Sequence, residues 1–92
     1  PDPLPTTFKV SQNFPNPFNQ STLILVELPF ASRLTIDVYN LEGRIQTSRN
    51  EGFISAGYHS VSFNSGQLPT GIYFLRISAE QTNSIIKIIL TK

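Results

Sequence analysis

Apolar and polar residues alternate in several short stretches of the chain. The clearest stretch is 33–40, in which Leu34, Ile36 and Val38 alternate with polar or aromatic side chains. Because successive side chains of a β-strand point to opposite faces, this period of two predicts a strand with one buried face. Two further stretches repeat the pattern, and their expected inward residues are Ile24, Val26 and Leu28 in 21–28 and Tyr73, Leu75 and Ile77 in 71–79.

Helical periodicity is nearly absent, and turn residues separate the candidate strands. The turn Leu41–Arg44 contains Gly43, which can adopt a positive φ, and therefore predicts a tight hairpin. The polar composition of 45–53 is typical of a short or edge strand. The predicted strands are 8–14, 21–28, 33–40, 45–53, 58–64, 71–79 and 84–91.

These strands predict an all-β fold, an immunoglobulin or fibronectin type III-like sandwich of about seven antiparallel strands. A small barrel is the alternative. Residues 1–7 are rich in proline and are predicted to be a linker, followed by one domain over residues 8–92. Because the chain begins at Pro1 rather than Met, we expect it to be a piece from the end of a longer protein, with Lys92 as the natural terminus.

Two loop segments carry specific expectations. The segment from Leu68-Pro69 through Gly71 to Tyr73 resembles the tyrosine corner of such sandwiches, in which the ring joins the core and its hydroxyl bonds to the backbone just upstream. In the segment 13–19, two prolines exclude a helix. We expect its aromatic residues, Phe14 and Phe18, to fold back and cap one end of the sandwich, with a sugar-contacting ligand loop as the alternative.

The last predicted strand is rich in isoleucine on both faces. Its inward residues would be Ile86, Ile88 and Leu90, which leaves Ile85 and Ile89 on the outer face beside Lys87. If this strand lies at a sheet edge, its backbone groups are free and a partner could add a strand there. The alternative is that a neighbouring domain covers its outer face.

Composition narrows the function classes. The chain has 92 residues, 39% of them hydrophobic, no cysteine and a net charge of +1. Its basic residues are scattered, so a nucleic-acid partner is not expected. The apolar runs are too short to span a bilayer, and a disulfide framework or thiolate metal site is impossible.

The sequence also offers no recognisable catalytic chemistry. His59 is the single histidine, and Ser60 beside it lacks the glycine-rich surroundings of a nucleophile elbow. The carboxylates are isolated along the chain, without the spacing of a calcium loop, and no phosphate-binding glycine loop occurs. We therefore predict no enzymatic activity, cofactor or metal, and expect a binding, structural or addressing module.

Five motifs occur in an order that resembles a known family, the type A C-terminal sorting domains of the type IX secretion system. They are Asn13-Phe14-Pro15-Asn16-Pro17-Phe18-Asn19, Val38-Tyr39-Asn40-Leu41-Glu42-Gly43-Arg44, Gly57-Tyr58-His59, Leu68-Pro69-Thr70-Gly71-Ile72-Tyr73-Phe74 and a terminal strand with Lys87. The resemblance covers about residues 14–92. It implies a secreted cargo protein of a Gram-negative bacterium, whose terminal β-sandwich is recognised by the outer-membrane secretion machinery.

The resemblance also assigns candidate recognition residues. The Gly-x-Tyr motif falls on Gly71 and Tyr73, preceded by Leu68 and Pro69, and the Gly-Arg turn and basic terminal strand supply Gly43, Arg44, Lys87 and Lys92. The implied partners are the secretion machinery and an N-terminal cargo domain in the same polypeptide. The implied location is the cell surface or the medium, reached through the periplasm and the outer membrane.

Two other functions stay open from the sequence. A carbohydrate-binding or cell-attachment module would need a row of exposed aromatic residues, for which Tyr39, Tyr58 and Phe74 are candidates. A structural assembly domain, like the related sandwich of flagellar hook-capping proteins, would need neither such a row nor a recognition surface.

Overall fold

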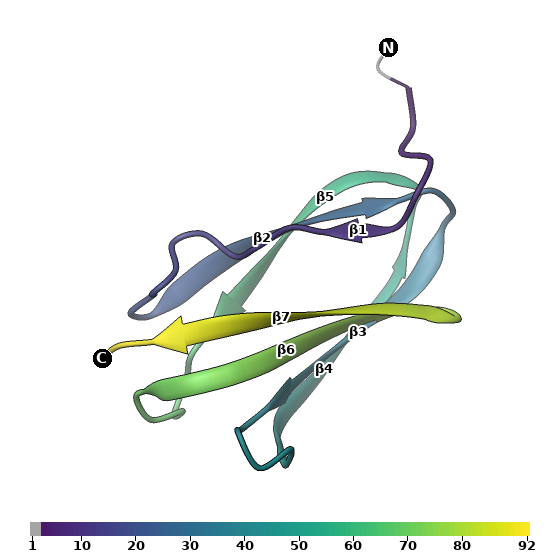
Figure 1. Cartoon of the computed structure of the whole chain (residues 1–92). Helices are drawn as coiled ribbons and strands as arrows, with labels where there is room; N and C mark the ends of the chain where they lie inside the picture. The colour runs from purple at the N-terminus through teal and green to yellow at the C-terminus, as the bar shows by residue number, and fades with distance from the viewer. Residues whose placement is uncertain (1–2) are drawn as a thin grey trace.

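The computed structural model describes residues 3–92, and this part of the chain folds into two packed β-sheets without a helix (Figure 1). Three strands form one sheet in the order β1–β2–β5, and four form the other in the order β4–β3–β6–β7. All paired strands are antiparallel. The strands are β1 (Lys9–Val10), β2 (Ser21–Leu28), β3 (Ser32–Tyr39), β4 (Ile45–Ile54), β5 (Gly57–Asn64), β6 (Gly71–Ala79) and β7 (Thr82–Leu90).

Two separate sheets confirm the predicted all-β sandwich, and the barrel alternative is not formed. The inward faces predicted from alternation are also confirmed for β2, β3, β6 and β7. The core between the sheets is built from aliphatic residues and three aromatic residues, Phe18, Phe63 and Tyr73. The rings of Phe18 and Phe63 form an edge-to-face pair with centroids 6.2 Å apart. This burial is the main source of stability for a domain that has no disulfide.

The first strand is much shorter than the predicted range 8–14. Only Lys9 and Val10 pair with β2, and a single bridge between Phe14 and Leu23 follows. Pro15 and Pro17 have no backbone N–H to donate, so the chain cannot extend this strand beyond Phe14. Residues 11–20 instead cross from the edge of the three-stranded sheet to the free edge of β7 in the other sheet.

The two ends of the sandwich carry different parts of the chain (Figure 1). The N-terminal segment lies at one end, beside the β2–β3 and β6–β7 turns. The other end, here called the C-terminal end, is formed by the segment 11–20, the β3–β4 turn at 40–44, the β5–β6 loop at 65–70 and residues 91–92.

Candidate functional site

Most of the candidate recognition residues meet at the C-terminal end of the sandwich, although they are far apart in the sequence. The antiparallel register places Gly71 opposite Leu90, and the start of β4 beside the end of β3. The β3–β4 turn, the β5–β6 loop and the chain terminus therefore lie on the same side of the molecule (Figure 1).

The β3–β4 turn is held in shape by a residue that the sequence analysis did not select as a site residue. The Asn40 side-chain oxygen accepts hydrogen bonds from the backbone N–H groups of Glu42, at 3.0 Å, and Arg44, at 2.9 Å. Gly43 completes the turn with a φ of +81°, a conformation that costs a residue with a Cβ about 1–2 kcal/mol. Arg44 consequently stands exposed where β4 begins, and the expected hairpin is confirmed.

The β5–β6 loop forms the expected tyrosine corner. The Tyr73 ring is buried, and its hydroxyl donates a 2.6 Å hydrogen bond to the backbone oxygen of Pro69. Leu68 packs against the core, and its N–H bonds to the oxygen of Ser65 at 3.0 Å. A Cβ at Gly71 would meet the Tyr73 ring at an ordinary distance of 3.7 Å, so this glycine is not required by crowding. These contacts make the corner a structural feature whose exposed part is Pro69.

The last residue is tied to the same loop. The backbone N–H of Lys92 donates to the Thr70 hydroxyl at 3.0 Å, and its ammonium group donates to the oxygen of Gly66 at 2.9 Å. The terminal residue is thus ordered, and it joins the end of β7 to the tyrosine corner. No sequence pattern identified Thr70 or Gly66, because their partner is more than twenty residues away.

Lys87 lies apart from these residues. It occupies the middle of β7, opposite Phe74 of β6, and its exposed side chain stands on the outer face of the four-stranded sheet. The eight candidate residues therefore divide into seven at or beside the C-terminal end and one on a sheet face.

The free side of β7 is occupied by the chain itself. The Phe18 N–H donates to the oxygen of Ile89 at 2.9 Å, and the Thr91 N–H donates to the oxygen of Phe18 at 2.8 Å. Two side chains add to this: Gln12 donates to the oxygen of Lys87 at 2.6 Å, and Asn16 accepts from the N–H of Ile89 at 3.0 Å. β7 is the edge strand of its sheet, but this part of its edge is already hydrogen-bonded.

The expectation that Phe14 and Phe18 both fold back onto the end of the sandwich is confirmed for Phe18 and wrong for Phe14. Phe18 is 2% exposed and joins the core, whereas Phe14 is 79% exposed. Phe14 pairs by its backbone with Leu23 on the solvent side, so its ring points away from the core. Alternation along β2 decides this, since Leu23 itself occupies an outward position.

The buried polar side chain of the asparagine-rich loop 13–19 has hydrogen-bond partners within the loop and on β2. Asn13 is buried and donates to the Thr22 hydroxyl at 3.2 Å and to the oxygen of Pro15 at 3.3 Å. The Thr22 hydroxyl in turn donates to the same Pro15 oxygen at 2.8 Å. These side chains hold the loop together, which favours the plug over the ligand loop.

The aromatic residues considered for sugar binding do not form one row. Tyr39 and Phe74 are direct neighbours on the outer face of the four-stranded sheet, and the Arg76 guanidinium lies 5.1 Å from the centre of the Tyr39 ring. Tyr58 is exposed on the outer face of the other sheet. A flat row of stacking rings is therefore not present at these three positions.

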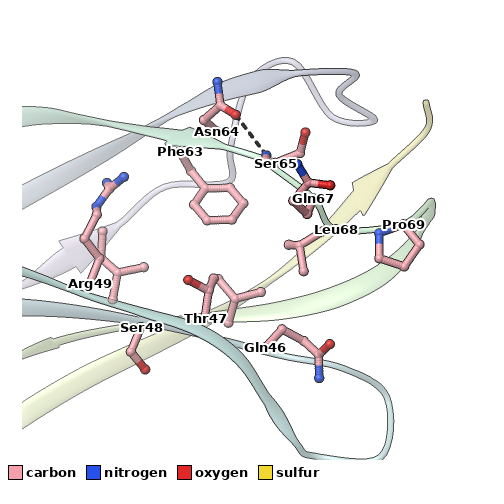
Figure 2. Close-up of a pocket in the computed structure, with 13 residues that line it drawn as sticks. Gln46, Thr47, Ser48, Arg49, Phe63, Asn64, Ser65, Gln67, Leu68 and Pro69 are labelled. Atoms are coloured by element: carbon pink, nitrogen blue, oxygen red, sulfur yellow. Dashed lines mark hydrogen bonds between the residues drawn. The ribbon is translucent and has the colours of Figure 1, made fainter.

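A cleft of about 460 Å³ opens between the edge strand β4 and the β5–β6 loop (Figure 2). Arg49 of β4 reaches across it and donates a 2.6 Å hydrogen bond to the oxygen of Ser62 on β5, while also pairing with Glu51 at 2.7 Å. The remaining lining is amide, hydroxyl and aliphatic apart from the Phe63 ring, without a nucleophile beside a base. The lining residues are Ile36, Val38, Gln46, Thr47, Ser48, Arg49, Phe63, Asn64, Ser65, Gly66, Gln67, Leu68 and Pro69.

No candidate metal centre is present within residues 3–92. No three His, Cys, Asp or Glu side chains there lie close enough to hold a metal ion. His59 bonds to the backbone oxygen of Ser55 at 2.7 Å, which orients the ring locally. The described segments also contain no helix that is long and apolar enough to cross a membrane.

A comparison of the sequence with models of known protein families gives one match. The model of a family described as "Secretion system C-terminal sorting domain" matches residues 12–91. The matched range begins at the loop that covers β7 and ends one residue before Lys92, so it includes seven of the eight candidate residues, all except Lys92. No curated protein matches the chain.

Proposed function

Because the chain belongs to the family of type IX secretion C-terminal sorting domains, which direct a larger protein across the outer membrane to the cell surface or the medium, we propose that residues 8–92 act as a non-catalytic export signal. We propose also that residues 1–7 link this signal to the cargo. The observation that carries the proposal is the match over residues 12–91, which spans six of the seven strands and the C-terminal end.

We further propose that the candidate residues have two kinds of role. The first group shapes the C-terminal end: Gly43 sets the turn, Leu68, Pro69 and Gly71 lead into the corner, and Tyr73 locks it. The second group presents cationic side chains to the secretion machinery: Arg44, Lys87 and Lys92 are all exposed. A side chain that must contact a partner needs to reach solvent, and in the first group Tyr73 is buried and the half-buried Leu68 packs against the core.

The contacts of two polar side chains support the proposal that the domain has no enzymatic activity. Within residues 3–92, the polar cleft beside β4 is bridged by Arg49, and His59 bonds to a backbone oxygen rather than to a nucleophile. Neither arrangement resembles a nucleophile held by an oriented base.

A reporter fusion tests the proposed function. Residues 1–92 are attached to the carboxyl end of a periplasmic reporter in a bacterium with a type IX system, and the reporter is measured in periplasm, cell surface and medium. We expect the reporter at the surface or in the medium, and in the periplasm when the translocation channel is deleted. A fusion that remains in the periplasm of the competent host contradicts the proposal, provided that the domain is folded there.

A further inference from the structure

We propose that the secretion machinery recognises the outer face of the four-stranded sheet, and that it does so with a protein surface that is apolar at its centre and carries carboxylates. This inference rests on the proposed function and specifies which surface performs it. The proposal concerns nine outward residues from three of the four strands: Arg33, Asp37 and Tyr39 of β3, Ile72, Phe74 and Arg76 of β6, and Ile85, Lys87 and Ile89 of β7.

The occupied part of the β7 edge disfavours one alternative, which is addition of a partner strand along the end of the last strand. Between Lys87 and Thr91, backbone groups of β7 are bonded to Gln12, Asn16 and Phe18. A partner strand would have to displace these bonds and extract the buried Phe18 ring from the core. Side chains on the outer face need no such rearrangement, because they already reach solvent.

The outer face has an apolar centre made of cross-strand neighbours. Ile72 lies opposite Ile89, and Phe74 lies between Tyr39 and Lys87. In the next row Ile85 lies opposite Arg76, and it is 57% exposed. Residues directly opposite each other on a sheet have Cβ atoms about 5 Å apart, so these side chains form one continuous surface.

The charges on this face are predominantly positive. The one carboxylate among its outward strand residues, Asp37, is paired with Arg76 at 3.2 Å and accepts a 2.6 Å hydrogen bond from Ser48 of β4. Arg76 is also held over the Tyr39 ring, so it is fixed in position. Lys87 is exposed and adds to the positive charge, whereas the exposed Arg33 lies beside Glu80 of the β6–β7 turn, which accepts a 3.0 Å hydrogen bond from the Arg33 backbone N–H. A complementary partner would therefore carry carboxylates around its apolar centre.

A protein partner fits this face better than a lipid surface. Recognition of anionic lipid headgroups by charge typically uses a cluster of about 4–8 Lys and Arg. The outer face has three cations, one of them engaged by Asp37, and its apolar centre is a sheet surface rather than a projecting wedge. Such fixed, flat side-chain rows are suited to a complementary protein surface.

The outer face of the three-stranded sheet is the competing surface, and it supplies the control. It also exposes apolar residues, among them Leu25, which is 56% exposed. Its charges are balanced, however, because Lys9 lies directly opposite Glu27. It also carries none of the cationic residues that the family resemblance selects.

Two matched double variants distinguish the faces. Ile85→Glu with Lys87→Glu changes the outer face of the four-stranded sheet, and Leu25→Glu with Lys9→Glu makes the same changes on the other sheet at positions of comparable exposure. We expect the first pair to lower export of the reporter fusion about tenfold or more, and the second to leave it within about twofold. Far-UV circular dichroism and thermal unfolding of each 92-residue chain test whether both variants remain folded. If the first pair unfolds the domain, Ile85→Ser with Lys87→Gln takes its place.

The outcomes separate the two proposals. If the unaltered fusion is not exported, the proposed function itself fails. If the unaltered fusion is exported and the Ile85/Lys87 variant is exported equally well, or if only the Leu25/Lys9 variant is impaired, the assignment of this face is wrong. Loss of binding to vesicles of phosphatidylethanolamine and phosphatidylglycerol in the Ile85/Lys87 variant would assign the face to lipid and overturn the protein partner.

Discussion

Truncation of Phe18 to alanine is expected to be the most destabilising change in the loop that covers β7. The side chain is 2% exposed and packs edge-to-face on Phe63 with centroids 6.2 Å apart. Replacing a buried Phe by Ala costs about 3–5 kcal/mol, of which the lost ring pair accounts for about 0.5–1.5 kcal/mol. A domain of 92 residues has a total stability of about 5–14 kcal/mol, so this single change removes a large part of it.

Urea unfolding monitored by far-UV circular dichroism measures the loss. With an m value of about 1 kcal/mol/M, the midpoint should fall by about 3–5 M, and a protein near the lower stability limit would be unfolded without urea. In that case Phe18→Leu keeps part of the contact and should cost about 1–3 kcal/mol. Phe14→Ala is the matched control, because it removes the same side chain four residues earlier from a position that is 79% exposed. We expect it to cost less than about 0.5 kcal/mol.

Equal losses of stability for the Phe18 and Phe14 variants would refute the assignment of Phe18 as the buried aromatic anchor of this loop. The same result would also weaken the case against strand addition, since that case depends on Phe18 holding the loop against the edge of β7.

Three further predictions concern local contacts. Tyr73→Phe should cost about 0.5–1.5 kcal/mol of stability, because it removes the hydrogen bond to Pro69. Tyr58→Phe at an exposed position should cost almost nothing. Urea unfolding compares the two variants, and equal costs would contradict the tyrosine corner. Gly43→Ala should cost about 1–2 kcal/mol of stability because of the positive φ at this position. Gly71→Ala should cost less than about 0.5 kcal/mol, since the added Cβ would meet only ordinary contacts. A larger loss of thermal stability for Gly71→Ala than for Gly43→Ala would be inconsistent with the turn geometry. Thr22→Val should cost about 1–3 kcal/mol, because it removes both hydrogen bonds of the Thr22 hydroxyl and leaves the side-chain nitrogen of Asn13 and the Pro15 oxygen only the 3.3 Å bond between them. An unchanged urea midpoint would argue against that network.

The faces of the strands could be predicted from the sequence, because a period of two fixes which side chains share a side. Ile24, Ile36, Leu75 and Ile88 are all essentially buried, as their alternation predicted. The tyrosine corner was predictable for a similar reason, since Tyr73 and Pro69 are four residues apart and their contact is local. Local patterns record local geometry directly.

The contacts that close the edge of β7 could not be predicted in this way. Asn16 bonds to a residue 73 positions away and Gln12 to one 75 positions away. A single sequence carries no signal for pairings of this length, because many alternatives satisfy the same polar groups equally well. The different fates of Phe14 and Phe18 follow from these pairings, since the backbone of Phe14 bonds to β2 and that of Phe18 to β7.

The same long-range contacts explain why the export signal should act as a folded unit rather than as a linear tail. The last strand supplies three core residues, Ile86, Ile88 and Leu90, and the loop anchored by Phe18 bonds along its edge. Deleting residues 86–92 would therefore remove part of the core together with Lys87, and loss of export in that deletion could not distinguish recognition from unfolding. Substitutions on the outer face avoid this ambiguity, because Ile85 and Lys87 lie outside the core. If a signal is a surface displayed by a sandwich, point changes that preserve the core are the ones that locate it.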